Sequence, residues 1–398
     1  MVRYILKRLF QSLVTILLVV CVVFFLMRLM PTDYFFTEDE LMKFDDAQKF
    51  AKLERMGVMM ICPDCHGTGL AEDGTPCATC IKNSTNPNSG SGFVDRSVFA
   101  QLGDFFKNMF EMRVYNEKGK LIKTIDPVNL WTYLKDPTVF DSHDKMKDTY
   151  HVGLAFNLGK SIRLEKGQYV TDVIVNKMGV SMSIGLVALA ISLILGVVLG
   201  VLQARYKDGI FDHIGTGYTV LVNAVPHLVI YTIIMIGGAA LFGLPMRYDA
   251  TAAEPWKTMV LPVVCLSIGS TAGYMLWTRR YMVDELNKDY IRLAKLKGLS
   301  DRKVMFRHVL KNAFVPLAQY LPYSILLTVG GSLLVERFFS VPGMGPELTN
   351  AISRYDVNLV QGIVLLYATM GILGVFLGDL LMTLIDPRIK LTGKEGVR

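Results

Sequence analysis

The chain has 398 residues, of which 52% are hydrophobic and 19% are charged, and its mean hydropathy is +0.37. A soluble domain of this length needs more polar surface, so the composition argues against a soluble enzyme or binding module and favours an integral membrane protein. The formal net charge of +7 would suit a nucleic-acid-binding protein, but many of the basic residues gather in short connections between apolar runs.

Six apolar runs are each close to the ~20 residues that a helix needs to cross a bilayer. They cover residues 13–27, 180–202, 217–244, 259–277, 314–334 and 359–385. The first run follows Arg3, Lys7 and Arg8 and in this resembles a signal peptide. No small-residue cleavage site follows it, so we expect a retained helix. The runs predict an all-α polytopic membrane protein with six transmembrane helices.

The basic residues also predict the orientation, because cytoplasmic connections carry an excess of Lys and Arg. They gather before the first span, after the second, between the fourth and fifth, and in the C-terminal tail. Alternating spans put these four segments on one side, so we expect both termini in the cytoplasm. The positive charge is then a signal of topology, and no separate basic domain is left for nucleic acid.

The same alternation places residues 31–177 outside the cytoplasm. Residues 39–57 have the apolar spacing of a short amphipathic helix, and residues 112–125 are typical of a β-hairpin around a Glu-Lys-Gly turn. Residues 83–92 are a loop by composition. We therefore expect a small extracytoplasmic α/β module inserted between the first and second transmembrane helices.

The connection between the fourth and fifth spans is the most informative segment of the chain. A short helix should run from Asp289 to Gly298, and Ser300 or Asp301 can cap a second helix. That second helix would carry a basic face and an apolar face. The basic face comprises Lys303, Arg307 and Lys311, and the apolar face comprises Met305, Phe306, Val309, Leu310 and Ala313. Spacing alone leaves two functions open, an interfacial helix on anionic lipid or a docking element for a soluble partner.

The same segment carries a family resemblance. It contains the pattern A-x-x-K-G-L-S…R-H-x-x-x-N-A-x-x-P, which resembles the coupling loop of bacterial ABC-importer permeases, specifically the B-type subunit of the dipeptide/oligopeptide/nickel group. The pattern is met by Ala294, Lys297, Gly298, Leu299, Ser300, Arg307, His308, Asn312, Ala313 and Pro316. The general importer motif has a Glu where this chain has Arg292, as this subgroup commonly does. Residues 26–33, 335–352, 355–366 and 379–390 also resemble the family, in the same order along the chain.

The resemblance implies an ABC-importer permease fold and a peptide-transport function at a prokaryotic cell membrane. A homologous second permease, two cytoplasmic ATPase subunits and an extracytoplasmic substrate-binding protein are the implied partners. The chain has no G-x-x-x-x-G-K-[ST] motif, so ATP would be bound only by partner subunits and the chain itself would not be an enzyme. The implied organisation is a first helix in 1–30, an external domain in 31–177, helices 2–4 in 178–288, a coupling loop in 289–312, helices 5–6 in 313–386 and a cytoplasmic tail in 387–398.

The resemblance also indicates site residues. Ala294, Lys297, Gly298, Leu299, Arg307, His308 and Asn312 would couple to an ATPase. Glu336, Pro342, Gly343 and Gly345 would form an external gate or pore mouth, the alternatives being a surface acid at Glu336 and a plain connecting loop. Asn223 and His227 are pore candidates, although helix packing explains both equally well.

The same sequence features are also compatible with other functions. A nickel or other small-solute importer has the same architecture. From a different class, a membrane-anchored metal or redox sensor would use the external segment as its detector. A membrane enzyme with catalytic cysteines lacks an evident base.

Four cysteines in the external segment form a C-x2-C-x11-C-x2-C pattern. They are Cys62, Cys65, Cys77 and Cys80. This spacing suits a structural Zn²⁺ site, and Gly67 and Gly69 ease the turn after the first pair. Disulfides are the main alternative outside the cytoplasm, followed by an iron–sulfur centre, and His66 is a weaker ligand candidate. Compared with the family, residues 58–93 and 111–151 are insertions, so the cluster is expected to be an accessory module.

Overall fold

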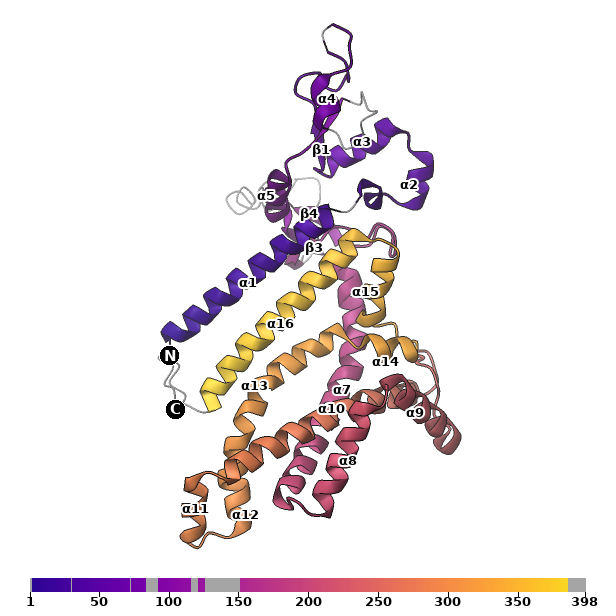
Figure 1. The fold of residues 1–398 in the computed structure, drawn as a ribbon. Coiled ribbons are helices and arrows are strands. Elements are labelled where there is room, and N and C mark those ends of the chain that lie inside the picture. Colours follow the sequence, from indigo (N-terminus) through magenta and orange to yellow (C-terminus); the bar gives the residue numbers. More distant parts are fainter. Residues whose placement is uncertain are drawn as a thin grey trace. The chain divides into compact units, whose positions relative to one another are not determined.

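The computed structural model describes residues 2–29, 31–71, 73–83, 92–115, 121–125 and 151–385 (Figure 1). The chain divides into two compact units. The first comprises Met1–Val19, Ile174–Asn350 and Leu365–Arg398, and the second comprises Val20–Val173 and Ala351–Val364. Three long helices contribute residues to both units, namely α1 (Val2–Arg28), α7 (Val170–Arg205) and α16 (Val357–Ile385).

The regular secondary structure of the first unit is helical, with no strand among its described residues. Besides parts of the three long helices and of α15 (Met344–Ser353), it contains α8 (Ile210–Ala224), α9 (His227–Phe242), α10 (Pro255–Leu286), α11 (Asp289–Leu296), α12 (Asp301–Lys303), the π-helical η3 (Val304–Leu310), α13 (Lys311–Leu327), the 3₁₀ turn η4 (Thr328–Gly330) and α14 (Leu333–Phe338). Figure 1 shows α11 and α12 at the end of the unit where α10 finishes.

Five helical segments of the described chain are long and apolar enough to cross a membrane, or six if one bent pair counts as a span. The prediction of a helical polytopic membrane protein is confirmed, but the prediction of one continuous third span at 217–244 is wrong. That region consists of α8 and α9, bent by 108°. The break lies at Val225 and Pro226, because proline has no N–H to donate and excludes helical geometry from the residue before it. Val225 accordingly has extended backbone, with φ −85° and ψ 133°.

Helices α7 and α10 approach each other closely. A Cβ atom on Gly196 would lie 2.5 Å from the Cβ of Tyr274, and one on Gly200 would lie 2.6 Å from the Cβ of Thr278. Small residues at such crossings let two backbones pack together within a membrane, where lipid provides no hydrophobic drive for association. The crossing therefore depends on glycine at two successive turns of α7.

The second unit combines short helices with two small antiparallel sheets. Its helical elements are η1 (Thr32–Phe35), α2 (Glu38–Lys43), α3 (Asp46–Arg55), α4 (Ala78–Asn83) and α5 (Val98–Asn108). Strands β1 (Met59–Ile61) and β2 (Phe93–Asp95) form one sheet, and β3 (Phe110–Tyr115), β4 (Leu121–Ile125) and β5 (His151–Phe156) form the other, in the order β4-β3-β5. The predicted hairpin is confirmed by the pairing of β3 with β4, and its turn lies outside the described residues.

The single amphipathic helix predicted at 39–57 is instead two helices. Thr37 and Glu40 form a capping box at the start of α2, and Asp45 and Gln48 form another at the start of α3. Each box pairs a side chain with a backbone N–H that has no partner within the helix, so two strong start signals divide the segment. The apolar periodicity continues across residues 39–57, so it did not reveal that a second helix begins at Asp46.

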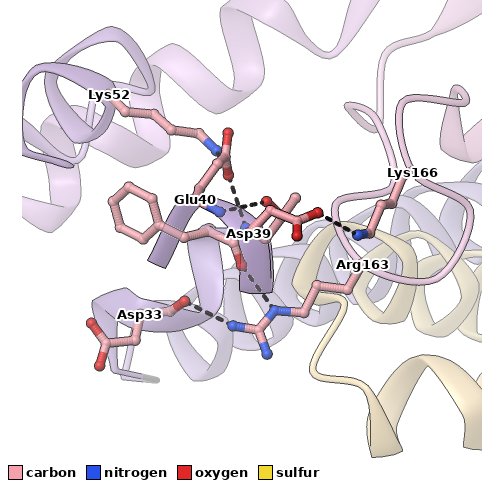
Figure 2. Close-up of polar contacts among 8 residues, drawn as sticks. Asp33, Asp39, Glu40, Lys52, Arg163 and Lys166 are labelled. Atoms are coloured by element: carbon pink, nitrogen blue, oxygen red, sulfur yellow. Dashed lines mark hydrogen bonds and ion pairs between the residues drawn. The ribbon is translucent and has the colours of Figure 1, made fainter. Parts of the chain in front are cut away.

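Polar contacts hold residues 33–52 to residues 160–167 within the second unit (Figure 2). The Arg163 guanidinium donates to the backbone oxygens of Asp33 and Phe36, both at 2.9 Å. The Asp356 carboxylate, fully buried, accepts from the Ser161 hydroxyl at 2.6 Å and from three successive backbone N–H groups. A buried carboxylate without a cation is stable only when donors surround it, as here.

Candidate functional site

The loop between α10 and α13 begins as predicted. Helix α11 spans Asp289–Leu296, and the following Gly298 has φ +78°, in the left-handed region that glycine favours. No atom lies within 4 Å of the position that a Cβ on Gly298 would take. Ser300 occupies the N-cap position of α12, but its side chain makes no capping hydrogen bond.

The inner side of this loop is a hydrophobic core. Ile291 and Ala294 of α11 pack with Val304 and Val309 of the π-helix, each of them buried. Met282 of α10 completes the cluster, together with Val201, Ala204, Met305 and Ala313. Packed interiors transmit displacement rather than absorb it. We therefore expect the loop to move together with the ends of α7 and α10 that share its core.

The outer side of the loop differs from the prediction. Residues Val304–Leu310 form a π-helix, which has more residues per turn than an α-helix and so changes the face on which each side chain falls. Phe306, expected on the apolar face, is 50% exposed. Its ring lines a surface pocket of about 480 Å³ together with Ser300, Arg302, Lys303 and Arg307. The exposed surface therefore places an aromatic ring among cations.

The two ends of the loop are joined by a polar brace of three residues, Glu285, Tyr290 and Asn312. The Tyr290 hydroxyl donates to the Glu285 carboxylate and accepts from the Asn312 side-chain amide at 2.8 Å. Burial and the bond to Glu285 raise the pKa of Tyr290 to about 12. Asn312, which we expect to contact an ATPase, is exposed and also contacts its own chain. No pattern in the sequence pointed to Tyr290 or Glu285.

The remaining coupling residues divide by exposure. Ala294 is buried in the core and Leu299 packs against it. Lys297, Gly298 and Arg307 are exposed, while His308 is half-buried. The structure thus brings the seven predicted residues into one loop but does not place them on one surface.

The predicted gate segment is organised around a buried acid. Glu336 in α14 is only 2% exposed, which rules out the alternative of a surface acid. Its carboxylate accepts from the backbone N–H of Ser332 at 3.1 Å and of Gly345 at 2.9 Å. The Ser181 hydroxyl of α7 also hydrogen-bonds it, and accepts from the N–H of Met344 at 2.8 Å. Glu336 therefore holds the turn before α15 against α7.

Glycine is required around this carboxylate. A Cβ on Gly331 or on Gly343 would collide with the Glu336 side chain, and one on Gly345 would lie 2.7 Å from the backbone of Leu333. Gly343 and Gly345 are buried, whereas Pro342 is exposed. Ser181 was not predictable, because it lies 163 positions from Met344 and only the fold brings them together.

The two pore candidates lie on opposite sides of the bend between α8 and α9. Asn223 lines a cavity of about 590 Å³ and donates through its amide to the Thr219 backbone oxygen at 2.7 Å. His227 is the first residue of α9, packs edge-on against the Tyr231 ring and does not line that cavity. The structure therefore separates the two residues.

The four cysteines come together as predicted. Cys62, Cys65, Cys77 and Cys80 are all buried, and their four Sγ atoms lie within 4.8 Å of one another. The Cys62–Cys77 pair is 3.9 Å apart and the Cys65–Cys80 pair is 3.4 Å apart, so neither is a disulfide. Four sulfurs at ~2.3 Å from a tetrahedral zinc ion lie about 3.8 Å from one another. The cluster therefore fits that ion with little change.

The backbone around the cluster is also shaped for thiolates. Gly67 and Gly69 have φ +90° and +76°, as the predicted turn requires. Burial raises the pKa of the Cys65 thiol, but hydrogen bonds from Cys80 and from the N–H groups of Gly69 and Gly67 bring it to about 7. Burial raises the pKa of Cys80. Backbone donors aimed at a sulfur stabilise its ionised form, which is the form that binds metal. His66 is exposed and lies outside the group.

Comparison with known proteins gives the following matches. A family described as "Binding-protein-dependent transport system inner membrane component" matches residues 196–391. The dipeptide transport system permease protein DppB of Bacillus subtilis is 34% identical over 262 residues, covering 66% of this chain and 82% of that protein. DppB of Lactococcus lactis is 30% identical over 246 residues, covering 61% and 79%.

The oligopeptide transport system permease protein AmiC of Streptococcus pneumoniae is 37% identical over 212 residues, or 53% of this chain. The alignment covers 42% of AmiC, so the chain spans less than half the length of this relative.

Proposed function

Since the chain belongs to the family of inner membrane components of binding-protein-dependent transport systems, we propose that it is a permease subunit of an ATP-driven importer of di- and oligopeptides. The observation that carries the proposal is the loop between α10 and α13. Its inner side is packed into the helices that would move, and its outer side presents Phe306 among cations. A surface of this kind suits a groove on a soluble partner better than it suits lipid alone, because an aromatic anchor in a pocket adds binding energy at a protein interface.

The proposed assembly has three kinds of protein partner. A homologous second permease completes the translocation path, two cytoplasmic ATPase subunits bind and hydrolyse ATP, and an extracytoplasmic protein delivers the peptide. The orientation that follows from the basic connections puts both termini and the loop 289–312 in the cytoplasm, and residues 31–177 outside.

In the proposed mechanism, closure of the ATPase dimer displaces the exposed side of the loop. The buried core passes the displacement to α7 and α10, and the brace at Tyr290 keeps the two ends of the loop together. At the other end of α7, Ser181 contacts Glu336 and the turn before α15. Movement of α7 would therefore reach the segment that we propose as the external gate, which contains Glu336, Pro342, Gly343 and Gly345.

We propose a structural zinc ion for the four cysteines, bound as thiolates by Cys62, Cys65, Cys77 and Cys80. The supporting observations are the close mutual spacing of the four sulfurs, their burial and the backbone donors at Cys65. The ion would stabilise residues 58–93, because the part of this segment that the structure describes has few buried apolar side chains besides the cysteines. This module is an accessory of the transporter and takes no part in moving the substrate.

Transport is tested with the complete complex in lipid vesicles, supplied with its binding protein and internal ATP. We expect labelled di- and oligopeptides to accumulate and Ni²⁺ not to. Accumulation of Ni²⁺ without peptide would favour the nickel importer. A chain that purifies without ATPase partners and transports nothing would favour a membrane-anchored sensor.

A further inference from the structure

Helices α10 and α13 present a surface that does not suit lipid tails. Tyr274, Trp277 and Tyr281 of α10 line a pocket of about 460 Å³ with Pro316, Tyr320 and Ser324 of α13. Trp277 is 46% exposed and Tyr320 is 63% exposed. The Trp277 and Tyr281 rings are stacked, with centroids 5.6 Å apart. The pocket lies in the range of ~300–1,000 Å³ in which proteins hold small ligands.

The chemistry of this surface contrasts with other exposed parts of the same unit. Helix α9 exposes aliphatic side chains, such as Ile233 at 66% and Leu241 at 77%, as a helix in contact with lipid tails does. The pocket instead displays phenol and indole groups, and the Tyr274 hydroxyl donates to the Ser324 hydroxyl at 3.1 Å. Polar groups within a spanning segment usually face a water-filled path or another protein, because lipid tails cannot hydrogen-bond to them.

A cation lies at the edge of the pocket. The guanidinium of Arg280 sits over the Trp277 ring, 5.1 Å from its centroid. No acidic side chain pairs with Arg280 among the residues that the structure describes. The neighbouring Arg279 differs, because Asp212 neutralises it through two contacts of 2.5 and 2.6 Å. Arg280 is therefore the net positive charge of this surface.

Arg280 also lines a second cavity. That cavity, of about 590 Å³, is lined by Arg280, Asn223 and Thr219 among others. The Asn223 amide nitrogen is bound to the Thr219 backbone, and its oxygen makes no hydrogen bond among the described residues. The guanidinium thus lies over an aromatic ring, and Arg280 also borders a cavity with polar lining residues.

We propose that this surface is a peptide subsite in which Arg280 binds the C-terminal carboxylate of the substrate and the aromatic pocket of α10 and α13 takes the adjacent side chain. The inference rests on the proposed function, since it names a site for the peptide within the permease. A planar guanidinium binds a carboxylate through two parallel hydrogen bonds, and the ring beneath it fixes its orientation. Aromatic walls accept side chains of many shapes, which suits a substrate of variable sequence.

The competing explanation is an interfacial belt, in which Trp, Tyr and Arg contact lipid headgroups. The complete complex in lipid vesicles separates the two when a photo-crosslinking amino acid replaces Tyr320. A matched control replaces Ile194 of α7, which is 64% exposed. During ATP-driven turnover we expect Tyr320→photo-crosslinker to form adducts with a labelled peptide and the Ile194 position to form none. Adducts with lipid alone, or with the second permease alone, would overturn the proposal.

The carboxylate contact has its own test in the same vesicles. Uptake of a peptide with a free C-terminus is compared with uptake of its C-terminal amide, for the wild type, Arg280→Gln and Arg280→Lys. We expect Arg280→Gln to lower uptake of the free acid by at least about tenfold while the amide changes little, and Arg280→Lys to restore part of the loss. Equal changes for both peptides would overturn the subsite. A wild-type complex that takes up neither peptide would instead refute the proposed function.

Discussion

Gly298 offers the sharpest test of the coupling loop. Its φ of +78° is strained for any residue with a Cβ, yet no atom lies within 4 Å of the Cβ position. A substitution therefore introduces no collision, and its whole effect is conformational. An L-residue in left-handed geometry costs about 1–2 kcal/mol. Asn tolerates this geometry better than other side chains, so it provides a control of similar size.

The expected effect follows directly from that penalty. If Gly298→Val shifts the loop away from its docking conformation by about 1–2 kcal/mol, the competent population falls by a factor of roughly 5–30. We expect peptide uptake per ATP hydrolysed to fall by the same factor, while Gly298→Asn stays much nearer to the wild type.

The assay measures peptide uptake and ATP hydrolysis in the same vesicles, after co-purification has shown that the ATPase subunits remain bound. Equal losses for Gly298→Val and Gly298→Asn would show that the side chain blocks a contact, and strain would not be the cause. Normal coupling in Gly298→Val would refute the role of the loop geometry.

Three further predictions follow from other contacts. Gly343→Ala should lower the free energy of unfolding by about 1–3 kcal/mol, because its Cβ meets Glu336, whereas Gly217→Ala, with no neighbour within 4 Å, should have little effect in the same thermal unfolding assay. The raised pKa of Tyr290 means that its stabilising contribution is complete below pH ~10 and is lost as the pH rises towards about 12, so unfolding of Tyr290→Phe should depend less on pH across that window. Elemental analysis should find one zinc ion per chain in the wild type and in Cys21→Ser but less in Cys65→Ser; the absence of both metal and free thiols in the wild type would refute the metal site.

The sequence was sufficient for the features that rest on local chemistry. Apolar length predicts the spans, Gly298 predicts the end of α11, and the cysteine spacing predicts a cluster that the fold indeed assembles. Each of these depends on residues that are close in the chain or on a composition that extends through a whole element.

Other features could not be predicted, because they depend on contacts across the fold. The π-helix exposes Phe306 although α-helical spacing places it on the apolar face, since the helix type there was not evident from local propensity. Pro226 was visible, but an apolar run that continues on both sides reads as one span, and only the structure shows the 108° bend. One partner of Glu336 is Ser181 on α7, which lies far from it in sequence.

The family pattern in the coupling loop therefore combines two physical roles. Ala294 and Leu299 belong to the buried core, and Asn312 belongs to the brace, so their substitution should act on the stability of the loop. Lys297 and Arg307 are exposed, so their substitution should act on docking without a loss of stability. A loop that served only as a docking surface would need the second group alone. The presence of both groups fits the proposed mechanism, in which the segment must stay rigid while it passes a displacement from a partner to α7 and α10.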